Sequence, residues 1–98
     1  MYDIEIRESV LEDLNEISDY IFRFSFSQET ANKIHDELMW RILSLKIFPY
    51  MFPVFEKQYR IMTVRKRYRI FYEVNENKKL VTIQYIFASE ENYQNLIH

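Results

Sequence analysis

The spacing of the apolar residues changes near Pro49, and this change constrains the fold more than any other feature of the chain. Between residues 9 and 47 the apolar residues recur every three or four positions, which is the period of an amphipathic helix. Between residues 59 and 87 they alternate with polar residues or form short runs, which is typical of strands. The two patterns predict one α+β domain over residues 1–98, in which a helical half packs on a sheet.

The first half of the chain predicts one strand followed by two helices. Residues 2–7 alternate between apolar and charged side chains, as in a half-buried strand. Ser9 and Glu12 have the spacing of a capping box, which predicts that the first helix begins there. Ser27 is the expected cap of the second helix, and Pro49 is expected to prevent its continuation. The short connection between the helices predicts an antiparallel hairpin.

The second half predicts an aromatic loop followed by an antiparallel meander. Residues 48–55 contain both prolines and three phenylalanines and are expected to form the loop. Three strands are expected at Tyr59–Val64, Tyr68–Val74 and Leu80–Phe87, joined by two tight turns. Together with the first strand they predict a curled, mostly antiparallel, four-stranded sheet with the helical hairpin on one face. Ser89 predicts the start of a short C-terminal helix.

Strand alternation predicts which side chains face the helices. In the middle strand, Ile70, Tyr72 and Val74 lie on one face, opposite Arg69 and Glu73. In the last strand, continuous alternation separates two sets, which are Val81, Ile83, Tyr85 and Phe87 on one side and Thr82, Gln84 and Ile86 on the other. We expect the polar sets to share the face away from the helices, and we expect function there. The register of the strand at residues 59–64 stays open, because both of its faces mix polar and apolar residues.

Three residue types are too scarce for several kinds of site. The chain has no glycine, which excludes glycine-rich phosphate loops and leaves Asn75 and Asn77 as the expected residues for positive φ. It has no cysteine, which excludes disulfides and thiolate chemistry. The two histidines, His35 and His98, have no metal-ligand spacing, so neither a metal nor another cofactor is expected. No segment is apolar enough to span a membrane, and a cytoplasmic location is the expectation.

The charges are sorted along the chain. Residues 1–47 carry ten acidic and five basic residues, whereas residues 48–98 carry five acidic and eight basic residues. The basic stretch consists of Lys57, Arg60, Arg65, Lys66, Arg67 and Arg69. Such a stretch forms either a solvated face or a surface that attracts polyanions, and the charge pattern leaves both interpretations open.

The basic stretch contains the residue types needed for metal-free RNA cleavage. This reaction needs a base, an acid and donors that stabilise the negative charge gained by the phosphorane. Arg69 has aromatic neighbours in the sequence and is a candidate phosphate anchor, although an ion pair with Glu73 is the structural alternative. Tyr93 and Glu56 are candidates for proton transfer.

Several segments resemble the RelE/ParE superfamily of type II toxins. They are the opening strand, residues 9–14 and 17–21, the stretch Leu45 to Pro53, Tyr59-Arg60, Tyr68–Val74 and Val81–Ile83. The resemblance implies the same order of elements and a cognate antitoxin that binds the toxin. It also implies one of two targets, since RelE-like members cleave mRNA in the ribosomal A site, whereas ParE-like members poison DNA gyrase.

The resemblance assigns roles to individual residues. Arg69 and Arg60 match arginines of the family and would contact phosphate, with Tyr93 as the aromatic residue near the end. The other residues of the basic stretch, Lys57, Arg65, Lys66 and Arg67, are expected from their charge, and not from the resemblance, to bind RNA or another target. The run Ala88–Glu91 departs from the family, because relatives carry a His or Tyr and two basic residues there. Three hypotheses therefore stay open, namely an mRNA endonuclease, favoured by a narrow margin, a gyrase poison and an inactive member.

Overall fold

The computed structural model describes residues 1–88, which form two helices and five strands. The elements are β1 (Asp3–Ile6), α1 (Glu8–Ser25), α2 (Gln28–Leu43), the 3₁₀ turn η1 (Ser44–Lys46), β2 (Val54–Glu56), β3 (Tyr59–Val64), β4 (Tyr68–Asn75) and β5 (Leu80–Ala88). The helix expected from Ser89 and the candidate Tyr93 lie outside the described residues. Within residues 1–88, neither helix combines the length and the apolar character that a membrane span requires.

The sheet has five strands rather than the four expected, in the order β1-β5-β4-β3-β2. The first strand is parallel to β5, and the other neighbours are antiparallel. The additional strand is β2, which lies in the segment expected to be an aromatic loop. It is only three residues long and its pairing with β3 contains a register shift, so it has no alternation for a sequence pattern to detect.

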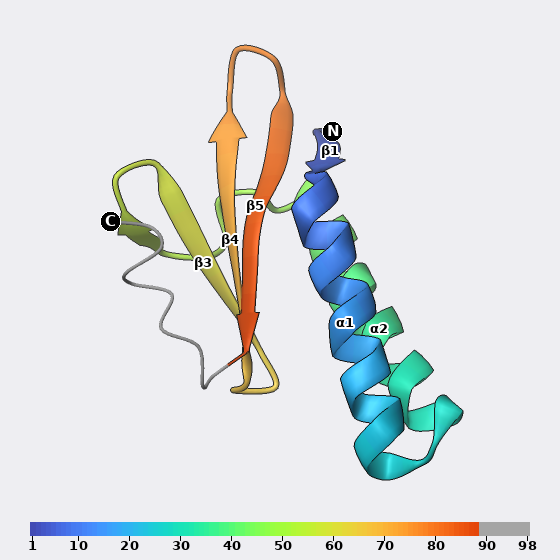
Figure 1. Cartoon of the computed structure of the whole chain (residues 1–98). Coiled ribbons are helices and arrows are strands. Elements are labelled where there is room, and N and C mark those ends of the chain that lie inside the picture. The colour runs from blue at the N-terminus through green and yellow to red at the C-terminus, as the bar shows by residue number, and fades with distance from the viewer. Residues whose placement is uncertain (89–98) are drawn as a thin grey trace.

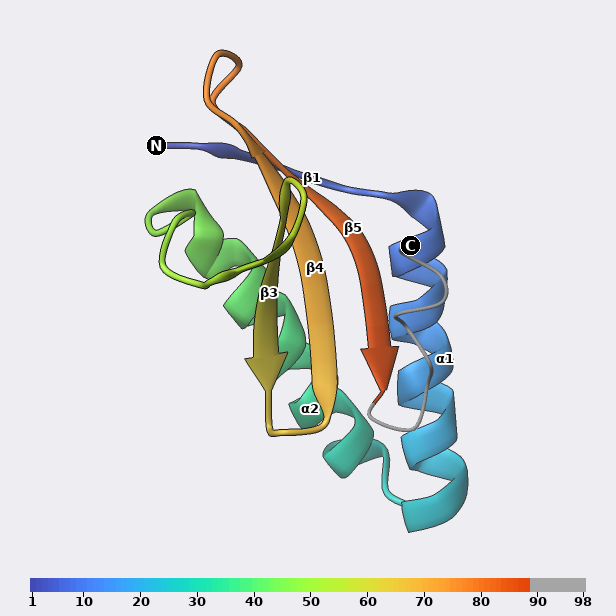
Figure 2. The same ribbon diagram turned by 90° about the vertical axis from the view of Figure 1, so that its left-hand side faces the viewer.

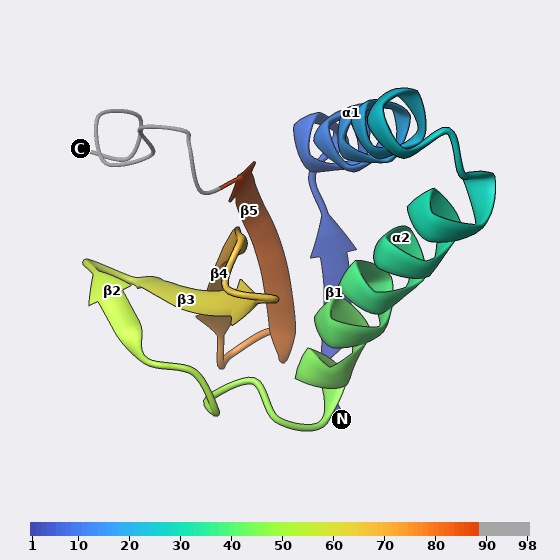
Figure 3. The same ribbon diagram turned by 90° about the horizontal axis from the view of Figure 1, so that it is seen from below.

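Both helices lie on one side of the sheet and leave its other side uncovered by them (Figure 1). They form the expected antiparallel hairpin, which extends past the end of the sheet at its α1–α2 connection (Figures 1 and 2). Seen from below, β2 and β3 bend away from β1 and the helices, so the sheet is curled (Figure 3). We call the side opposite the helices the open face.

The first helix begins earlier than the expected capping box. Its N-cap is Arg7, which makes no side-chain capping hydrogen bond, and Ser9 lies inside the first turn. The carbonyl of Arg7 already accepts hydrogen bonds from the amides of Val10 and Leu11, because the chain enters the helix directly after β1. The capping box at Ser9 is therefore wrong. The cap of α2 is confirmed, since the Ser27 hydroxyl accepts a hydrogen bond from the amide of Thr30 at 3.1 Å.

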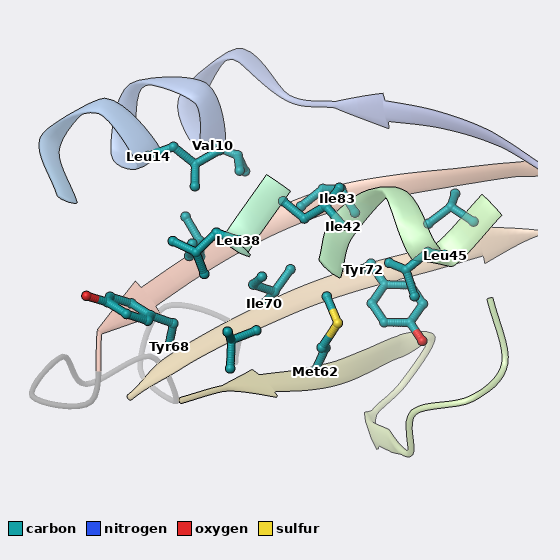
Figure 4. Packing of buried hydrophobic residues seen from close by; sticks show 13 residues of the cluster. Val10, Leu14, Leu38, Ile42, Leu45, Met62, Tyr68, Ile70, Tyr72 and Ile83 are labelled. Carbon is teal, nitrogen blue, oxygen red and sulfur yellow. The ribbon is translucent and has the colours of Figure 1, made fainter. Parts of the chain in front are cut away.

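The main core lies between the helical hairpin and the sheet (Figure 4). Val10 and Leu14 of α1 and Leu38 and Ile42 of α2 are almost completely buried. They pack against buried residues of the three central strands, namely Met62, Val64, Tyr68, Ile70, Tyr72, Val81, Ile83 and Ile86. Each large apolar side chain buried here stabilises the fold by roughly 1.5–3 kcal/mol. This core therefore determines which side chains of β4 face the helices.

A bulge in β5 changes the faces expected from alternation. Phe71 pairs with Tyr85, but the next residue, Tyr72, pairs with Ile83, so Gln84 is an extra residue in β5. Tyr85 and the following Phe87 consequently lie on the open face, although they were expected to share a face with Ile83. That part of the prediction is wrong, because an inserted residue reverses the alternation beyond it.

The turns take positive φ at residues other than the expected asparagines. The five residues with positive φ in residues 1–88 are Phe26, Lys57, Arg65, Lys66 and Lys79. Asn75 instead accepts a hydrogen bond at its side-chain oxygen from the amide of Lys78, at 3.1 Å. In a chain without glycine, each of these residues adopts the left-handed region at a cost of about 1 kcal/mol.

Tyr72 anchors the segment between η1 and β2 to the sheet. Its hydroxyl donates a hydrogen bond to the Pro49 carbonyl at 2.8 Å in a buried position. Burial raises the pKa of Tyr72 to about 12, although the nearby Arg60 acts in the opposite direction. The tyrosine is therefore held neutral, with its proton available for this hydrogen bond.

We predict that Tyr72→Phe changes the alkaline branch of the stability curve. Because an unfolded tyrosine has a pKa of about 10, the contribution of Tyr72 is complete below pH 10 and is lost as the pH rises toward 12. Urea denaturation should show a shallower alkaline decline in the variant, by about 2 kcal/mol. At pH 7 the variant should be about 1 kcal/mol less stable, since the Pro49 carbonyl loses its donor. Equal declines in both proteins would contradict this role.

Candidate target-binding face

The open face carries a second, smaller cluster of apolar and aromatic residues. Its members are Phe55, Tyr59, Ile61, Phe71, Tyr85 and Phe87. The Phe71 ring lies 5.4 Å from that of Phe55 and 5.8 Å from that of Phe87, both edge-on. Tyr85 stacks on Phe87 at 5.8 Å. We call this set the aromatic cluster. Phe71 and Phe87 are buried within it, and the other four residues are partly buried, so the partly exposed rings are those of Phe55, Tyr59 and Tyr85.

Arg69 lies on the open face beside the aromatic cluster. It occupies β4 and pairs across the sheet with Thr63 on one side and Phe87 on the other. Its location away from the helices is as expected. The side chain is half-buried, and its Nη1 is enclosed without a hydrogen-bond acceptor among the described residues. The structural alternative, a pair with Glu73, is not formed here, since that carboxylate accepts a hydrogen bond from Gln58 instead.

Arg60 lies on the opposite side of the sheet from Arg69. Arg60 pairs with Tyr72, and paired residues share a face, so its side chain is on the helix side. Its Nη1 donates hydrogen bonds to the Phe52 carbonyl at 2.7 Å and, more weakly, to the Tyr50 carbonyl at 3.4 Å. The guanidinium carbon also lies 5.0 Å from the centre of the Tyr50 ring. These contacts tie the aromatic loop to β3, and they do not bring the two arginines together.

The other expected site residues fall at two separate ends of the sheet. Glu56 pairs with Tyr59 at the end of β2, and Lys57 follows it in the β2–β3 turn. The remaining basic residues, Arg65, Lys66 and Arg67, form the β3–β4 turn at the other end of β3 (Figure 1). The expected catalytic set is therefore not assembled in one place within residues 1–88.

The β3–β4 turn is held in place by its neighbours. Arg65 donates a hydrogen bond from Nε to Glu37 of α2 at 2.7 Å, which joins the turn to the helical layer. The guanidinium of Arg67 lies 5.8 Å from the centre of the Tyr68 ring. The amide of Arg67 closes the turn on the Val64 carbonyl at 3.1 Å. With positive φ at both central residues, this is the arrangement of a type I′ hairpin turn.

Sequence reasoning missed a polar group at the other end of the aromatic cluster. Burial raises the pKa of Tyr59, with Tyr85 and Glu73 adding to the shift and Arg7 opposing it. Arg7 itself reaches the bulge residue Gln84, with Nη1 3.0 Å from its side-chain oxygen. Alternation could not place Tyr59, because both faces of its strand mix polar and apolar residues, and the bulge in β5 concealed the orientation of Tyr85. With its pKa raised, Tyr59 is neutral at physiological pH, and its hydroxyl can donate a hydrogen bond to a partner.

A cleft of about 680 Å³ opens between α1 and one end of the sheet, where β4 begins and β5 ends. One face of α1 supplies Asp13, Glu16, Tyr20 and Arg23, and the sheet supplies Tyr68, Ile86, Arg67 and Ala88. The cleft carries charges of both signs. No group of three or more potential metal ligands exists in the part of the chain that the structure describes. The described surfaces therefore offer binding by rings, cations and tyrosine hydroxyls.

The arrangement of these elements is that of the RelE fold. The crystal structure of the isolated E. coli RelE toxin superposes with a TM-score of 0.65 at 14% identity, over 99% of this chain and 96% of that one. A chain in the crystal structure of the intact E. coli RelBE toxin-antitoxin complex gives a TM-score of 0.65 at 15% identity, over 93% of this chain and 100% of that chain. At these identities the likeness concerns the fold alone.

The sequence comparison identifies the family. The model of the ParE toxin of the type II toxin-antitoxin system parDE matches residues 4–93. The chain therefore belongs to this family of toxins within the RelE/ParE superfamily, which confirms the resemblance seen in the sequence. A search of curated proteins found no match.

The two arginines should respond differently to neutral substitution. We predict that Arg60→Gln lowers the free energy of unfolding by about 2 kcal/mol, because it loses a charged donor and the contact with the Tyr50 ring. Arg69→Gln should change it by less than about 0.5 kcal/mol, since its enclosed Nη1 has no acceptor among the described residues. Urea denaturation at pH 7 measures both, and an equal loss in the two variants would give Arg69 a structural role as well.

Proposed function

We propose that this toxin inhibits growth by binding DNA gyrase in the cytoplasm through its open face, without a catalytic step. The family match to ParE toxins supports this target, because ParE-like members of the superfamily are gyrase poisons. The open face supports it as well, since the partly exposed rings of Tyr59 and Tyr85, on the same face as Arg69 of β4, are suited to contact with a protein. A cognate antitoxin neutralises the toxin.

The observation that carries this proposal is the separation of the two arginines. Cleavage of RNA requires donors and proton-transfer groups that converge on one phosphate. Arg60 instead contacts backbone carbonyls on the helix side, while Arg69 is on the open face. Glu90 and Glu91 also replace the basic residues that nuclease relatives carry. The narrow preference of the sequence for an mRNA endonuclease is therefore reversed in this proposal.

The endonuclease stays as the second candidate because of one local observation. The Nη1 nitrogen of Arg69 is enclosed and has no acceptor among residues 1–88. Arg69 also pairs across the sheet with Phe87, a member of the aromatic cluster. A phosphate beside Arg69 with a base on the aromatic cluster would use both features. Cleavage by this route would rely on Tyr93 or Glu56 for proton transfer.

The antitoxin has a large apolar surface available to it. Trp40 is 69% exposed, Ile47 62%, Phe48 58% and Met51 70%, and they lie on α2 and the segment that follows it. A small domain does not leave so many large apolar side chains in water without a partner. E. coli RelE, which has the same fold, is bound by its antitoxin in the RelBE complex. We assign the surface formed by these four residues to the antitoxin of this chain.

The target can be decided by comparing gyrase and ribosome assays. We predict that the purified toxin makes gyrase accumulate cleaved plasmid DNA in the presence of ATP, and that DNA synthesis stops before protein synthesis after induction. Tyr85→Ala, which removes a ring from the open face, should reduce gyrase poisoning at least tenfold, because a central aromatic anchor contributes about 2 kcal/mol or more to binding.

The matched control for this experiment is Leu11→Ala, an exposed apolar residue of α1, which should leave gyrase poisoning unchanged. Specific mRNA cleavage on translating ribosomes, lost in Arg69→Ala and accompanied by no effect on gyrase, would overturn the proposal in favour of the endonuclease.

Antitoxin binding should depend on the exposed surface of α2. We predict that Trp40→Ala weakens the complex with the product of the adjacent reading frame at least tenfold, because a buried interface tryptophan is commonly worth 2 kcal/mol or more. The toxin's own stability should change little, since the side chain is 69% exposed. Titration calorimetry measures the affinity, with Phe24→Ala as the control at the far end of the hairpin. Unchanged affinity in Trp40→Ala would place the antitoxin elsewhere.

A further inference from the structure

The helical layer and the sheet have opposite charge. Residues 8–43 carry eight acidic and three basic residues, whereas residues 44–88 carry three acidic and nine basic residues. The cations are not spread evenly along the strands of the sheet. Four of them, Arg65, Lys66, Arg67 and Arg69, lie within five consecutive positions at one end of β3 and β4. That end therefore has the highest local density of positive charge in the described part of the chain.

The two residues at the apex of the β3–β4 turn are cations in a backbone conformation that is unfavourable for residues other than glycine. Arg65 and Lys66 have φ of 56° and 57°, positions that Asn-Gly would fill with less strain. Lys66 is exposed, and within residues 1–88 it makes no hydrogen bond or ion pair. Arg65 is joined to Glu37, so the turn is fixed while its apex charge stays in water. A strained, fixed and solvated cation is suited to an anionic partner that approaches from outside.

The surroundings of the turn indicate what kind of anion it meets. The β3–β4 turn itself has no exposed large apolar side chain, and neither has β3 or β4. The exposed ring that shares a cleft with Arg67 is that of Tyr20, which belongs to α1. Protein interfaces have an apolar centre, which the turn itself does not provide. A nucleic-acid backbone, by contrast, is bound by lysine and arginine contacts to phosphate alone.

We propose that the β3–β4 turn, with Lys66 at its apex, binds the phosphate backbone of double-stranded DNA. The choice of DNA over RNA rests on the gyrase target proposed above, because gyrase presents the toxin with a bound DNA duplex. The open face then contacts the enzyme, and the turn contacts the DNA beside it. Each phosphate contact adds affinity that falls with salt concentration and does not depend on sequence.

The chain contains a matched pair of lysines for the test. Lys66 and Lys79 are both exposed turn residues with positive φ, 57° and 51°, but Lys79 lies in the β4–β5 turn at the other end of β4. Glycine at either position removes one charge and relieves one strained backbone position. Lys66→Gly should therefore unfold at a higher temperature than the wild type. Lys79→Gly also loses the ion pair with Glu76 and the contact of the ammonium group with the Tyr2 ring at 5.3 Å, so its unfolding temperature should stay close to that of the wild type. These measurements guard against effects of misfolding.

The experiment measures binding of the full-length toxin to a labelled 20-base-pair DNA duplex by fluorescence anisotropy at several salt concentrations. Lys66→Gly should weaken binding about three- to tenfold and reduce the slope of log K against log salt by about 1, while Lys66→Arg should restore both. Lys79→Gly should bind as the wild type does. Equal losses in Lys66→Gly and Lys79→Gly, or no loss in either, would overturn the proposal.

Two further arms separate the alternatives. Tighter binding to a duplex RNA of the same sequence would overturn the assignment to DNA. Loss of antitoxin affinity in Lys66→Gly, with DNA binding unchanged, would make the turn a protein contact and would also overturn it. A failure of the proposed function would look different from a failure of this proposal. The wild-type toxin would bind DNA through Lys66 as described, but it would not poison gyrase.

Discussion

The burial of one side of β4 beneath the two helices is the interaction on which the rest of the structure depends. Ile70 and Tyr72 are completely buried in the main core, where they meet α1, α2 and the neighbouring strands. Because side chains alternate along a strand, this burial directs Arg69 and Phe71 to the open face. The same register sends Arg60, the partner of Tyr72 in β3, to the helix side. One packing contact thus separates a structural arginine from an arginine that is available for a target.

The sequence predicted the elements better than it predicted their faces. The bounds of β3 were predicted from strand-forming residues that precede a tight turn, and the Ser27 cap from hydroxyl chemistry, because both depend on neighbouring residues alone. The orientation of Tyr85 could not be found in this way. It depends on a bulge at Gln84, which arises from the pairing of β5 with β4 and has no local signal. The three-residue strand β2 was missed for the same reason, since only its partner β3 defines it.

The candidate site shows the same limit. The sequence identified the basic residues, and family resemblance gave Arg69 and Arg60 related roles, but strand pairing places them on opposite faces. Successive residues of a strand lie on opposite faces of a sheet, so a shift of one position moves a side chain from the inner to the outer side. Position along the chain therefore does not show whether two side chains meet at one site. The absence of glycine had an unexpected consequence as well. Positive φ falls on Lys57, Arg65, Lys66 and Lys79, so the turns of this sheet carry charge where other proteins use small residues.

The claim that the open face, and not the helix side, contacts the target can be tested most directly by site-specific photocrosslinking. A photoreactive residue would be introduced at Thr63, which is exposed and paired with Arg69 on the open face, and separately at Trp40 on α2. The account predicts crosslinks to gyrase from position 63 and none from position 40. Crosslinks from position 40 alone would contradict it.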